Sequence, residues 1–435
     1  MKRTSFSEES GSDKLEITGL SPIYIGSGDK YSQLDYVSDG NKIHVIDFSK
    51  ILDHIPLESI DDFTNEINAN FKNNVWRGEV KEFLKNYNVD WKDYVEKSYD
   101  LVGEIGKNEI NQFVKTSDQI YIPGSSVKGA IRTSILYQIL KNHPNKRAQI
   151  SDYISRSYRP RDRDLQRLLR SDGKTDLLRA LIVSDSTLKD RRSFTKVVKS
   201  NVYHLREREL QSPIFNEILG KDFKSSGFIK INDKLVDSGY LISNFFSLKK
   251  EAILEAINLF SREIIEQELQ QFRDQDDENL TEIVRFYNGL TDQIESMKDN
   301  ECALRLGQGS SFIAITMFLQ FKDNFNWIKR LTNLEVYTFN APDRQDRRYA
   351  IARDRGFTVL PDRNSEHKPR FGLNEKWLCK AIRTIQQKKI KIVSLIEQVS
   401  GEFNFKNIVY PITRKFVVSG DKPILPYGWV KLKWG

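Results

Sequence analysis

The segment at residues 121–133 constrains the fold of this chain more than any other. It reads Tyr-Ile-Pro-Gly-Ser-Ser-Val-Lys-Gly-Ala-Ile-Arg-Thr and places two glycines, two serines and two cations at the start of a patterned helix. After Ser126 the apolar residues recur at helical spacing, so one stripe is predicted to be buried while Lys128 and Arg132 share another face. The unpaired N–H groups of a helix start favour a phosphate. The pattern therefore predicts a phosphate-binding helix N-terminus.

The kind of phosphate can be narrowed from the same segment. No GxxxxGK[ST] loop is present, because Lys128 comes before Gly129 instead of after it. This order argues against a nucleoside-triphosphate site. The backbone of a polynucleotide is the better candidate.

Composition excludes several classes of protein. The chain has 435 residues, of which 39% are hydrophobic, which is typical of a globular protein with two or three domains. Two cysteines and five scattered histidines show no ligand spacing, so neither zinc nor a disulfide framework is expected, and we expect no cofactor. No apolar run reaches the ~18 to 20 residues of a membrane span, and the first residues lack the apolar centre of a signal peptide. We expect a cytoplasmic protein without membrane contact.

The net charge of +8 is unevenly distributed. Residues 146–208 hold 17 Lys and Arg against 8 Asp and Glu, and residues 341–400 hold 14 against 7. Residues 261–301 reverse the balance, with 4 against 12. This distribution predicts a basic face for a polyanion and an acidic helical face for a protein partner or solvent. Solvated charged helices are an equal interpretation of the acidic block.

Short strands alternate with long helices along the chain. We expect strands at 14–20, 42–48, 177–185, 194–203, 227–232 and 428–434, and helices within 57–115, at 126–141, within 244–300 and at 374–398. The apolar run 312–321 fits either a helix or a strand, and we favour a helix. Glycine-rich loops are expected at 22–29 and 303–312, and irregular stretches at 145–175 and 341–370. This order predicts an α+β protein with two small sheets.

The two glycine-rich loops, taken with the helix motif, resemble a known family. Ser21-Pro-Ile-Tyr-Ile-Gly-Ser-Gly28, the 121–132 motif and Arg305-Leu-Gly-Gln-Gly-Ser310 together resemble the RAMP superfamily of CRISPR proteins. More narrowly, the order of the three, with Val183-Ser-Asp-Ser186, Pro411-Ile-Thr-Arg414 and the closing Pro426-Tyr-Gly-Trp-Val-Lys, resembles the fifth-subunit family of the type III-A (Csm) effector complex.

The resemblance implies two ferredoxin-like (RRM/RAMP-type) domains with helical insertions, which we place at 1–235 and 236–435. It implies a non-catalytic subunit that caps the 3′ end of the guide RNA (crRNA) and is required for its maturation in antiviral defence. The implied partners are crRNA, target RNA, the repeated backbone RAMP subunit and the small helical subunit, with a host nuclease as a further candidate.

The residues predicted to contact RNA come from these motifs. The helix motif and the resemblance favour contact, but a serine-capped helix with two surface cations, a plain β-turn and a helix-entry turn remain open for the three segments. The predicted set is Gly26, Ser27, Gly28, Gly124, Ser125, Ser126, Lys128, Gly129, Arg132, Arg305, Gly307, Gln308, Gly309, Ser310 and Arg414.

A second function remains open at this point, because related RAMP proteins cut precursor RNA without a metal by general acid/base chemistry. In such a metal-independent endoribonuclease of repeat RNA, His44, His204 and Asp35 would be the candidates. None of the histidines lies beside a glycine-rich loop, and each is explained more simply as a structural residue. We therefore predict no catalytic residue.

Overall fold

The computed structural model describes residues 12–72, 75–76, 78–156, 175–188, 194–205, 207–239, 241, 245–322, 339–340, 357–360, 370–373 and 411–435. The chain divides into two compact units. The first comprises Met1–Pro144, Arg161–Leu319 and Pro411–Gly435, and the second comprises Asn145–Pro160 and Gln320–Tyr410. Each unit is described by itself.

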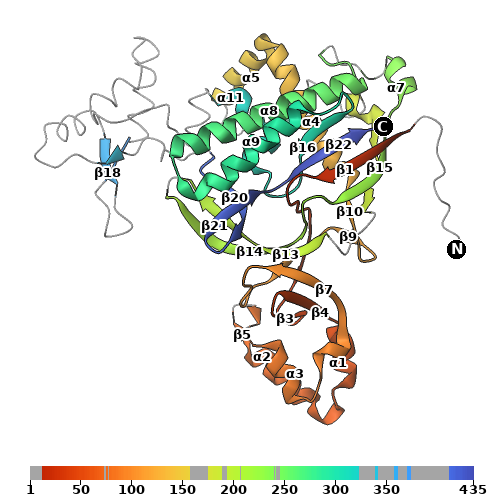
Figure 1. Ribbon diagram of the computed structural model, residues 1–435, viewed down its shortest axis with the longest axis vertical. Helices are drawn as coiled ribbons and strands as arrows, with labels where there is room; N and C mark the ends of the chain where they lie inside the picture. Colours follow the sequence, from red (N-terminus) through yellow and green to blue (C-terminus); the bar gives the residue numbers. More distant parts are fainter. Residues whose placement is uncertain are drawn as a thin grey trace, which may run out of the picture. The chain divides into compact units, whose positions relative to one another are not determined.

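One sheet of the first unit joins the two ends of the chain. Strand β1 (Asp13–Gly19) lies between β15 (Lys224–Ile231) and β22 (Trp429–Trp434) and is antiparallel to both. Figure 1 shows β1 beside β22, whose residues close the chain. The full order is β16 (Glu301–Arg305), β22, β1, β15, β12 (Ser186–Leu188), β10 (Gln119–Ile122) and β9 (Lys115–Thr116), with β11 (Leu181–Val183) also paired to β15. We call this the terminal sheet.

The terminal sheet buries one face because its strands alternate in polarity. In β1, Leu15 and Ile17 are fully buried. Two helices pack together above the sheet, α4 (Gly124–Asn142) and α8 (Lys250–Gln275), with the rings of Tyr137 and Phe260 4.7 Å apart. The hydroxyl of Ser261 on α8 donates to the carbonyl oxygen of Ala303 on β16 at 2.6 Å.

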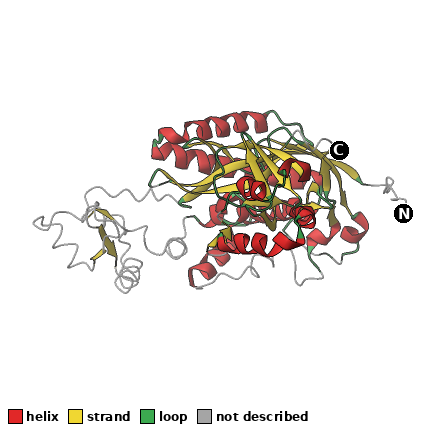
Figure 2. Ribbon diagram, turned by 90° about the horizontal axis from the view of Figure 1, so that it is seen from below, coloured by secondary structure: helices red, strands yellow, loops and turns green. Residues whose placement is uncertain are grey.

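A second sheet of nine strands, the central sheet, is built around one long strand. Strand β13 (Thr195–His204) pairs with β14, β7 and β20, and its pairing with β7 is parallel. The order is β2 (Gly26–Tyr31), β8 (Ile110–Phe113), β14 (Glu209–Leu219), β13, β7 (Val95–Val102), β4 (Lys42–Ile46) and β3 (Tyr36–Asp39). Outside this order, β20 (Thr413–Ser419) pairs with β13, and β21 (Lys422–Pro426) pairs with β20. Figure 2 shows the strands covered by helices.

A small helical insertion lies between β4 and β7. It contains α1 (Phe48–His54), α2 (Ile60–Ala69), the short hairpin β5 (Phe71–Lys72) and β6 (Val75–Trp76), and α3 (Val80–Asn86). Its core is aromatic, with Phe63 against Phe83 at 4.7 Å and Trp76 against Phe83 at 5.8 Å. The expectation of helix as far as residue 115 is wrong, because the last helix ends at Asn86 apart from a 3₁₀ turn at Trp91–Tyr94. Strands β7 and β8 follow.

The acidic block folds as a helical hairpin. Helix α8 ends at Gln275 because Asp276 takes a left-handed conformation, with φ of 45°. Helix α9 (Thr281–Glu295) then runs back beside it. Tyr287 of α9 is fully buried and lies 5.9 Å from the ring of Phe272 on α8. The predicted helical pattern of 244–300 is confirmed.

The α+β class is confirmed, and so are most of the predicted strands. Residues 177–185 differ, because a 3₁₀ turn at Leu177–Ala180 precedes a strand of only three residues, β11. The run 312–321 forms two short helices, α10 (Ser311–Ile315) and α11 (Phe318–Phe321). The division at residue 235 stays a prediction.

The second unit holds fewer described elements. They are α5 (from Pro144 to Arg156), β17 (Phe339–Asn340), β18 (Phe357–Leu360) and β19 (Arg370–Leu373). β18 and β19 pair in antiparallel register, so part of the stretch expected to be a long loop is strand. The helix predicted at 374–398 and most of 145–175 lie outside the described residues.

Candidate nucleic-acid interface

The start of α4 is held against the loop between β11 and β12. Gly124 is buried, and its amide donates to the carboxylate oxygen Oδ1 of Asp185 at 2.8 Å. A Cβ at Gly124 would lie 2.2 Å from the carbonyl oxygen of Val183. Glycine is therefore required here for packing, and its amide already has an anionic partner. Ser125 is exposed and Ser126 is partly exposed, so the accessible part of the motif begins after Gly124.

The two cations of α4 both have partners within the chain. Lys128 donates from Nζ to the carbonyl oxygen of Leu181 at 2.7 Å, and burial lowers the pKa of its ammonium group. Arg132 forms an ion pair with Asp176 at 2.9 Å. Gly129, between them, is exposed, with open space where a Cβ would stand. Lys128 and Arg132 therefore lie outside the buried apolar stripe of α4, as expected, but each cation already has a partner within the chain.

The two glycine-rich loops, far apart in sequence, lie side by side. The amide of Gln308 donates to the carbonyl oxygen of Tyr24 at 2.8 Å. A third turn joins them, since the amide of Gly428 donates to Pro22 at 2.9 Å and the amide of Leu306 donates to Gly428 at 2.7 Å. The ends of β1, β16 and β22 thus present one continuous group of loops, which we call the loop cluster: residues 22–28, 306–310 and 427–428.

Glycine is required at two positions of the loop cluster. Gly307 has φ of +79° and Gly309 has φ of +87°, a region that other residues seldom adopt. A Cβ at Gly307 would lie 2.4 Å from the carbonyl oxygen of Tyr24, and one at Gly309 would lie 3.0 Å from the Cβ of Tyr427. These glycines let the loops approach each other closely.

The exposed edge of the loop cluster comes from the first loop and from Gln308. Residues Gly26, Ser27 and Gly28 begin strand β2 instead of forming a free loop, and the pairing with β8 is irregular between Gly26 and Lys30. All three are exposed, and the hydroxyl of Ser27 accepts from the amide of Asp29 at 3.1 Å. An irregular strand start of this kind leaves backbone groups open to a ligand.

Arg305 and Arg414 do not reach the surface. Arg305 donates to Glu268 at 3.1 Å and to the carbonyl oxygen of Tyr427 at 3.1 Å. Arg414 donates to the other oxygen of Glu268 at 2.7 Å and to Gln271 at 2.6 Å. Glu268 is 0% exposed, and the two arginines are 5% and 2% exposed. The guanidinium groups expected to contact phosphate are instead a buried support of the loop cluster.

Ser310 belongs to the same support, because it is buried and its hydroxyl donates to the carbonyl oxygen of Gly307. Sequence reasoning missed the residue that follows Arg414. Lys415 is partly exposed and lies over the rings of Tyr24, at 5.8 Å, and Tyr427, at 5.9 Å. The sequence pattern that could have indicated Lys415 is the alternation of β20, because adjacent residues of a strand point to opposite faces of the sheet.

The three residues of the endonuclease alternative have local structural partners. Nδ1 of His44 lies 2.8 Å from the Ser98 hydroxyl, and burial lowers the pKa of this histidine. Nδ1 of His204 lies 3.5 Å from the carboxylate oxygen Oε2 of Glu207. Asp35 accepts from the amide of Ser32 at 2.6 Å. Each of them is thus explained by the fold around it.

Neither a metal centre nor a membrane span emerges from the part of the chain that the structure describes. No group of three or more His, Cys, Asp or Glu side chains is placed there to hold a metal ion. In that same part, none of the helices is both long and apolar enough to cross a membrane.

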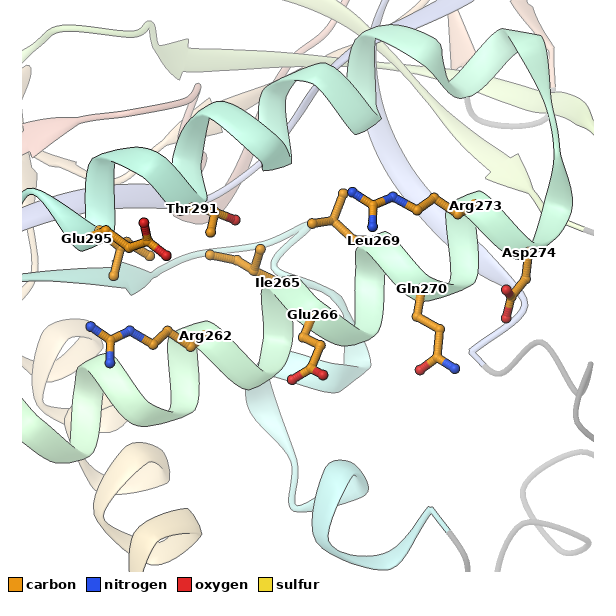
Figure 3. A pocket seen from close by; sticks show the side chains of 10 residues that line it. Arg262, Ile265, Glu266, Leu269, Gln270, Arg273, Asp274, Thr291 and Glu295 are labelled. Carbon is orange, nitrogen blue, oxygen red and sulfur yellow. The ribbon is translucent and has the colours of Figure 1, made fainter.

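A pocket of about 630 Å³ lies between α8 and α9 (Figure 3). Ile265, Leu269 and Ile294 line it with buried apolar side chains. The polar residues lining it carry both signs of charge: Arg262, Arg273, Glu266, Asp274 and Glu295. Three carboxylates against two guanidinium groups do not suit a polyanion. None of the predicted RNA-binding residues lines this pocket.

Comparison with known proteins confirms the resemblance seen in the motifs. The model of the RAMP superfamily matches residues 16–312. A curated relative named CRISPR system Cms protein Csm5, from Methanocaldococcus jannaschii, is 28% identical over 323 residues, which is 71% of this chain and 73% of the relative. A protein of the same name from Streptococcus thermophilus is 27% identical over 139 residues, 28% of this chain and 37% of that protein.

Two solved structures share the fold. A chain in a Csm–crRNA–target RNA ternary complex of a type III-A CRISPR-Cas system matches with a TM-score of 0.62 and 19% identity, over 97% of this chain and all of that one. The crystal structure of T. onnurineus Csm5 matches with a TM-score of 0.58 and 20% identity, over 95% of this chain and 99% of that one.

Proposed function

The chain belongs to the RAMP superfamily, and on that premise we propose that it is a non-catalytic, guide-RNA-binding subunit of a type III-A CRISPR effector complex. In this proposal it caps the 3′ end of the crRNA and is needed for crRNA maturation in antiviral defence. Two curated relatives carry the name of one such subunit, and one structural neighbour is a chain in a Csm–crRNA–target RNA complex.

The observation that carries the proposal is the hydrogen bond from the Gln308 amide to Tyr24. It joins two glycine-rich loops that lie far apart in the sequence into one cluster, with Gly26, Ser27, Gly28 and Gln308 exposed along its edge. Backbone amides and small polar side chains suit a phosphate backbone, which they hold without reading sequence. Contacts of this kind are nearly independent of sequence, and the cations of α4, Lys128 and Arg132, would make the affinity sensitive to salt.

The proposed contacts divide into two groups by exposure. The exposed edge of the loop cluster, with Ser125, Ser126 and Gly129 of α4, would contact RNA directly, and Lys128 and Arg132 would do so by exchanging an internal partner for a phosphate. Gly124, Gly307, Gly309, Ser310, Arg305 and Arg414 would act by holding these segments in place.

A protein partner accounts for the acidic hairpin better than RNA does. Helices α8 and α9 carry most of the chain's acidic block, and we propose that they face other subunits of the complex, either the repeated backbone subunit or the small helical subunit. Recruitment of a host nuclease is a further part of the proposal, because a subunit without a cleavage site needs one for maturation.

The proposal is tested by co-expressing the chain with the other effector subunits and a guide array, and sizing the RNA that co-purifies. Omission of the chain should leave guides long or heterogeneous. Gln308→Glu should reduce RNA retention, since it adds a carboxylate at the exposed edge of the loop cluster. Gln211→Glu is the matched control, because Gln211 is an exposed glutamine on β14, outside the loop cluster, α4 and the α8–α9 hairpin.

If omission leaves both guide length and complex composition unchanged, the capping role is wrong. Cleavage of repeat RNA by the purified chain, lost on substitution of His44, His204 or Asp35, would establish the endoribonuclease instead. Retention of normal guides by the Gln308→Glu complex would move the RNA contact away from the loop cluster.

A further inference from the structure

Lys415 and its neighbour Arg414 lie in different surroundings although they are adjacent on β20. Lys415 lies opposite Val202 of β13, and its side chain extends over two tyrosine rings. Arg414 points to the other face of the sheet and is enclosed by Glu268 and Gln271. Adjacent residues of a strand point to opposite faces, so a buried ion pair on one side leaves the next cation on the other.

The two rings connect Lys415 with both glycine-rich loops. Tyr24 belongs to the first loop, and a Cβ at Gly26 would lie 2.6 Å from its hydroxyl oxygen. Tyr427 belongs to the closing turn, packs against Gly309 and shares a hydrogen bond with the hydroxyl of Ser200. The ammonium group of Lys415 therefore sits at the point where the three segments of the loop cluster meet.

The surroundings of Lys415 offer it aromatic faces but no anionic partner among the described residues. Burial alone lowers the pKa of its ammonium group, to about 8, with no carboxylate acting against it. Tyrosine rings attract a cation but leave its charge uncompensated. A partly buried cation in this position is stabilised by an anion that arrives from outside.

We propose that Lys415, on β20 beside the loop cluster, is a phosphate-binding residue that holds one phosphodiester of a single-stranded RNA running along the edge formed by Gly26, Ser27, Gly28 and Gln308. The inference rests on the proposed function and makes it more specific. It assigns to Lys415 the direct contact that the sequence pattern suggested for Arg414.

The test compares Lys415→Gln, Lys415→Arg and Lys422→Gln with the unchanged protein, each as the purified full chain free of guide RNA. Lys422 is an exposed lysine on β21 of the same hairpin, so its substitution removes an equal charge. Affinity for unstructured oligouridine and oligoadenosine is measured across a series of salt concentrations. Loss of one phosphate contact should reduce the slope of log affinity against log salt by about 0.7.

We expect Lys415→Gln to lower the affinity for both RNAs to a similar extent and to reduce the salt slope. Lys415→Arg and Lys422→Gln should both keep the salt slope of the unchanged protein. Thermal unfolding of each variant separates loss of contact from loss of fold. An unchanged slope in folded Lys415→Gln overturns the inference, as does an equal reduction in Lys422→Gln. If the unchanged full chain, free of guide RNA, binds neither RNA, the proposed function itself fails, and this inference fails with it.

Discussion

Glu268 is the residue on which the support of the loop cluster depends most. It is fully buried between the guanidinium groups of Arg305 and Arg414. Glu268→Ala would leave two buried positive charges without their carboxylate, so we expect it to lower the free energy of unfolding by about 3–5 kcal/mol. Denaturant titration of the purified chain measures this loss.

The matched control is Glu263→Ala on the same helix. Glu263 pairs with Lys141 at 2.5 Å near the surface, and such pairs contribute less than about 1 kcal/mol. Equal losses for the two variants would mean that the buried ion pairs are not what holds β20 and β16 against α8.

We predict that the proposed phosphate contact of Lys415 makes the affinity for RNA depend on pH. The free protein holds this ammonium with its pKa lowered to about 8 by burial, so the group is charged at pH 7 and loses its proton as pH rises through 8. Affinity for RNA should therefore decrease between pH 7 and 9. Tyr24 and Tyr427, which face Lys415, have pKa values raised to about 12, mainly by burial, and stay protonated over this range.

Fluorescence anisotropy with labelled oligouridine at fixed ionic strength measures the effect. The Lys415→Arg variant supplies the control, because guanidinium keeps its charge throughout. A pH profile that is the same for lysine and arginine at this position would contradict the prediction.

Residue identity alone could not distinguish Arg414 from Lys415. The motif Pro-Ile-Thr-Arg-Lys shows two adjacent cations, and which of them faces outward depends on the register of β20 against β13. Glu268, the partner that takes Arg414, lies 146 positions earlier in the sequence. A pairing over such a distance leaves no local signal in the sequence.

At the scale of elements, α4 offers a direct comparison between two glycines of one helix. A Cβ at Gly124 would lie 2.2 Å from one carbonyl oxygen and 2.7 Å from the next, so Gly124→Ala must displace the helix from β11. We expect a loss of about 1–3 kcal/mol in the free energy of unfolding. Gly129 faces open space inside the helix, so Gly129→Ala should stabilise by about 0.5–1 kcal/mol.

Thermal unfolding measures both effects. The melting temperature should fall for Gly124→Ala and rise for Gly129→Ala. Binding of RNA by Gly129→Ala adds a second measurement. Reduced affinity in this more stable variant would support close approach of RNA to α4, while unchanged affinity would confine the RNA to the loop cluster.

The elements predicted best from the sequence are those in which the spacing of apolar residues matches the spacing of buried positions. Strand β1 alternates, and α8 carries a continuous apolar stripe. Strand β7 was missed because its residues, Val-Glu-Lys-Ser-Tyr-Asp-Leu-Val, do not alternate regularly between apolar and polar side chains. It is a strand because β4 and β13 pair with its two edges, and that tertiary context overrides local preference.

At the scale of the whole molecule, both sheets of the first unit mix strands from the two halves of the chain. In the terminal sheet, β22 and β16 from the second half continue the sheet of β1 and β15 from the first half. In the central sheet, β20 from the second half pairs with β13 from the first. The composition of the halves predicted an α+β fold but carried no sign of this exchange, because strand pairing between distant segments leaves no periodic pattern.

Because both sheets contain strands from the two halves, we can predict what happens when the chain is divided near residue 235, the boundary expected from the sequence. A fragment of residues 1–239 exposes the edge of β1 that β22 normally covers, and a fragment of residues 241–435 lacks β1 altogether. An uncovered hydrogen-bonding edge with an apolar face favours aggregation. We therefore expect each fragment alone to be poorly soluble and the two expressed together to associate into one folded protein.

Co-purification through a tag on residues 1–239, followed by thermal unfolding, measures the association. The control is the fragment 241–410, which keeps α8, α9 and β16 but lacks β20, β21 and β22. It should not be retained, since the strands that pair with β1 and β13 are those it has lost. If residues 1–239 alone unfold cooperatively at the temperature of the whole chain, the halves are independent domains and the shared sheets contribute little to stability.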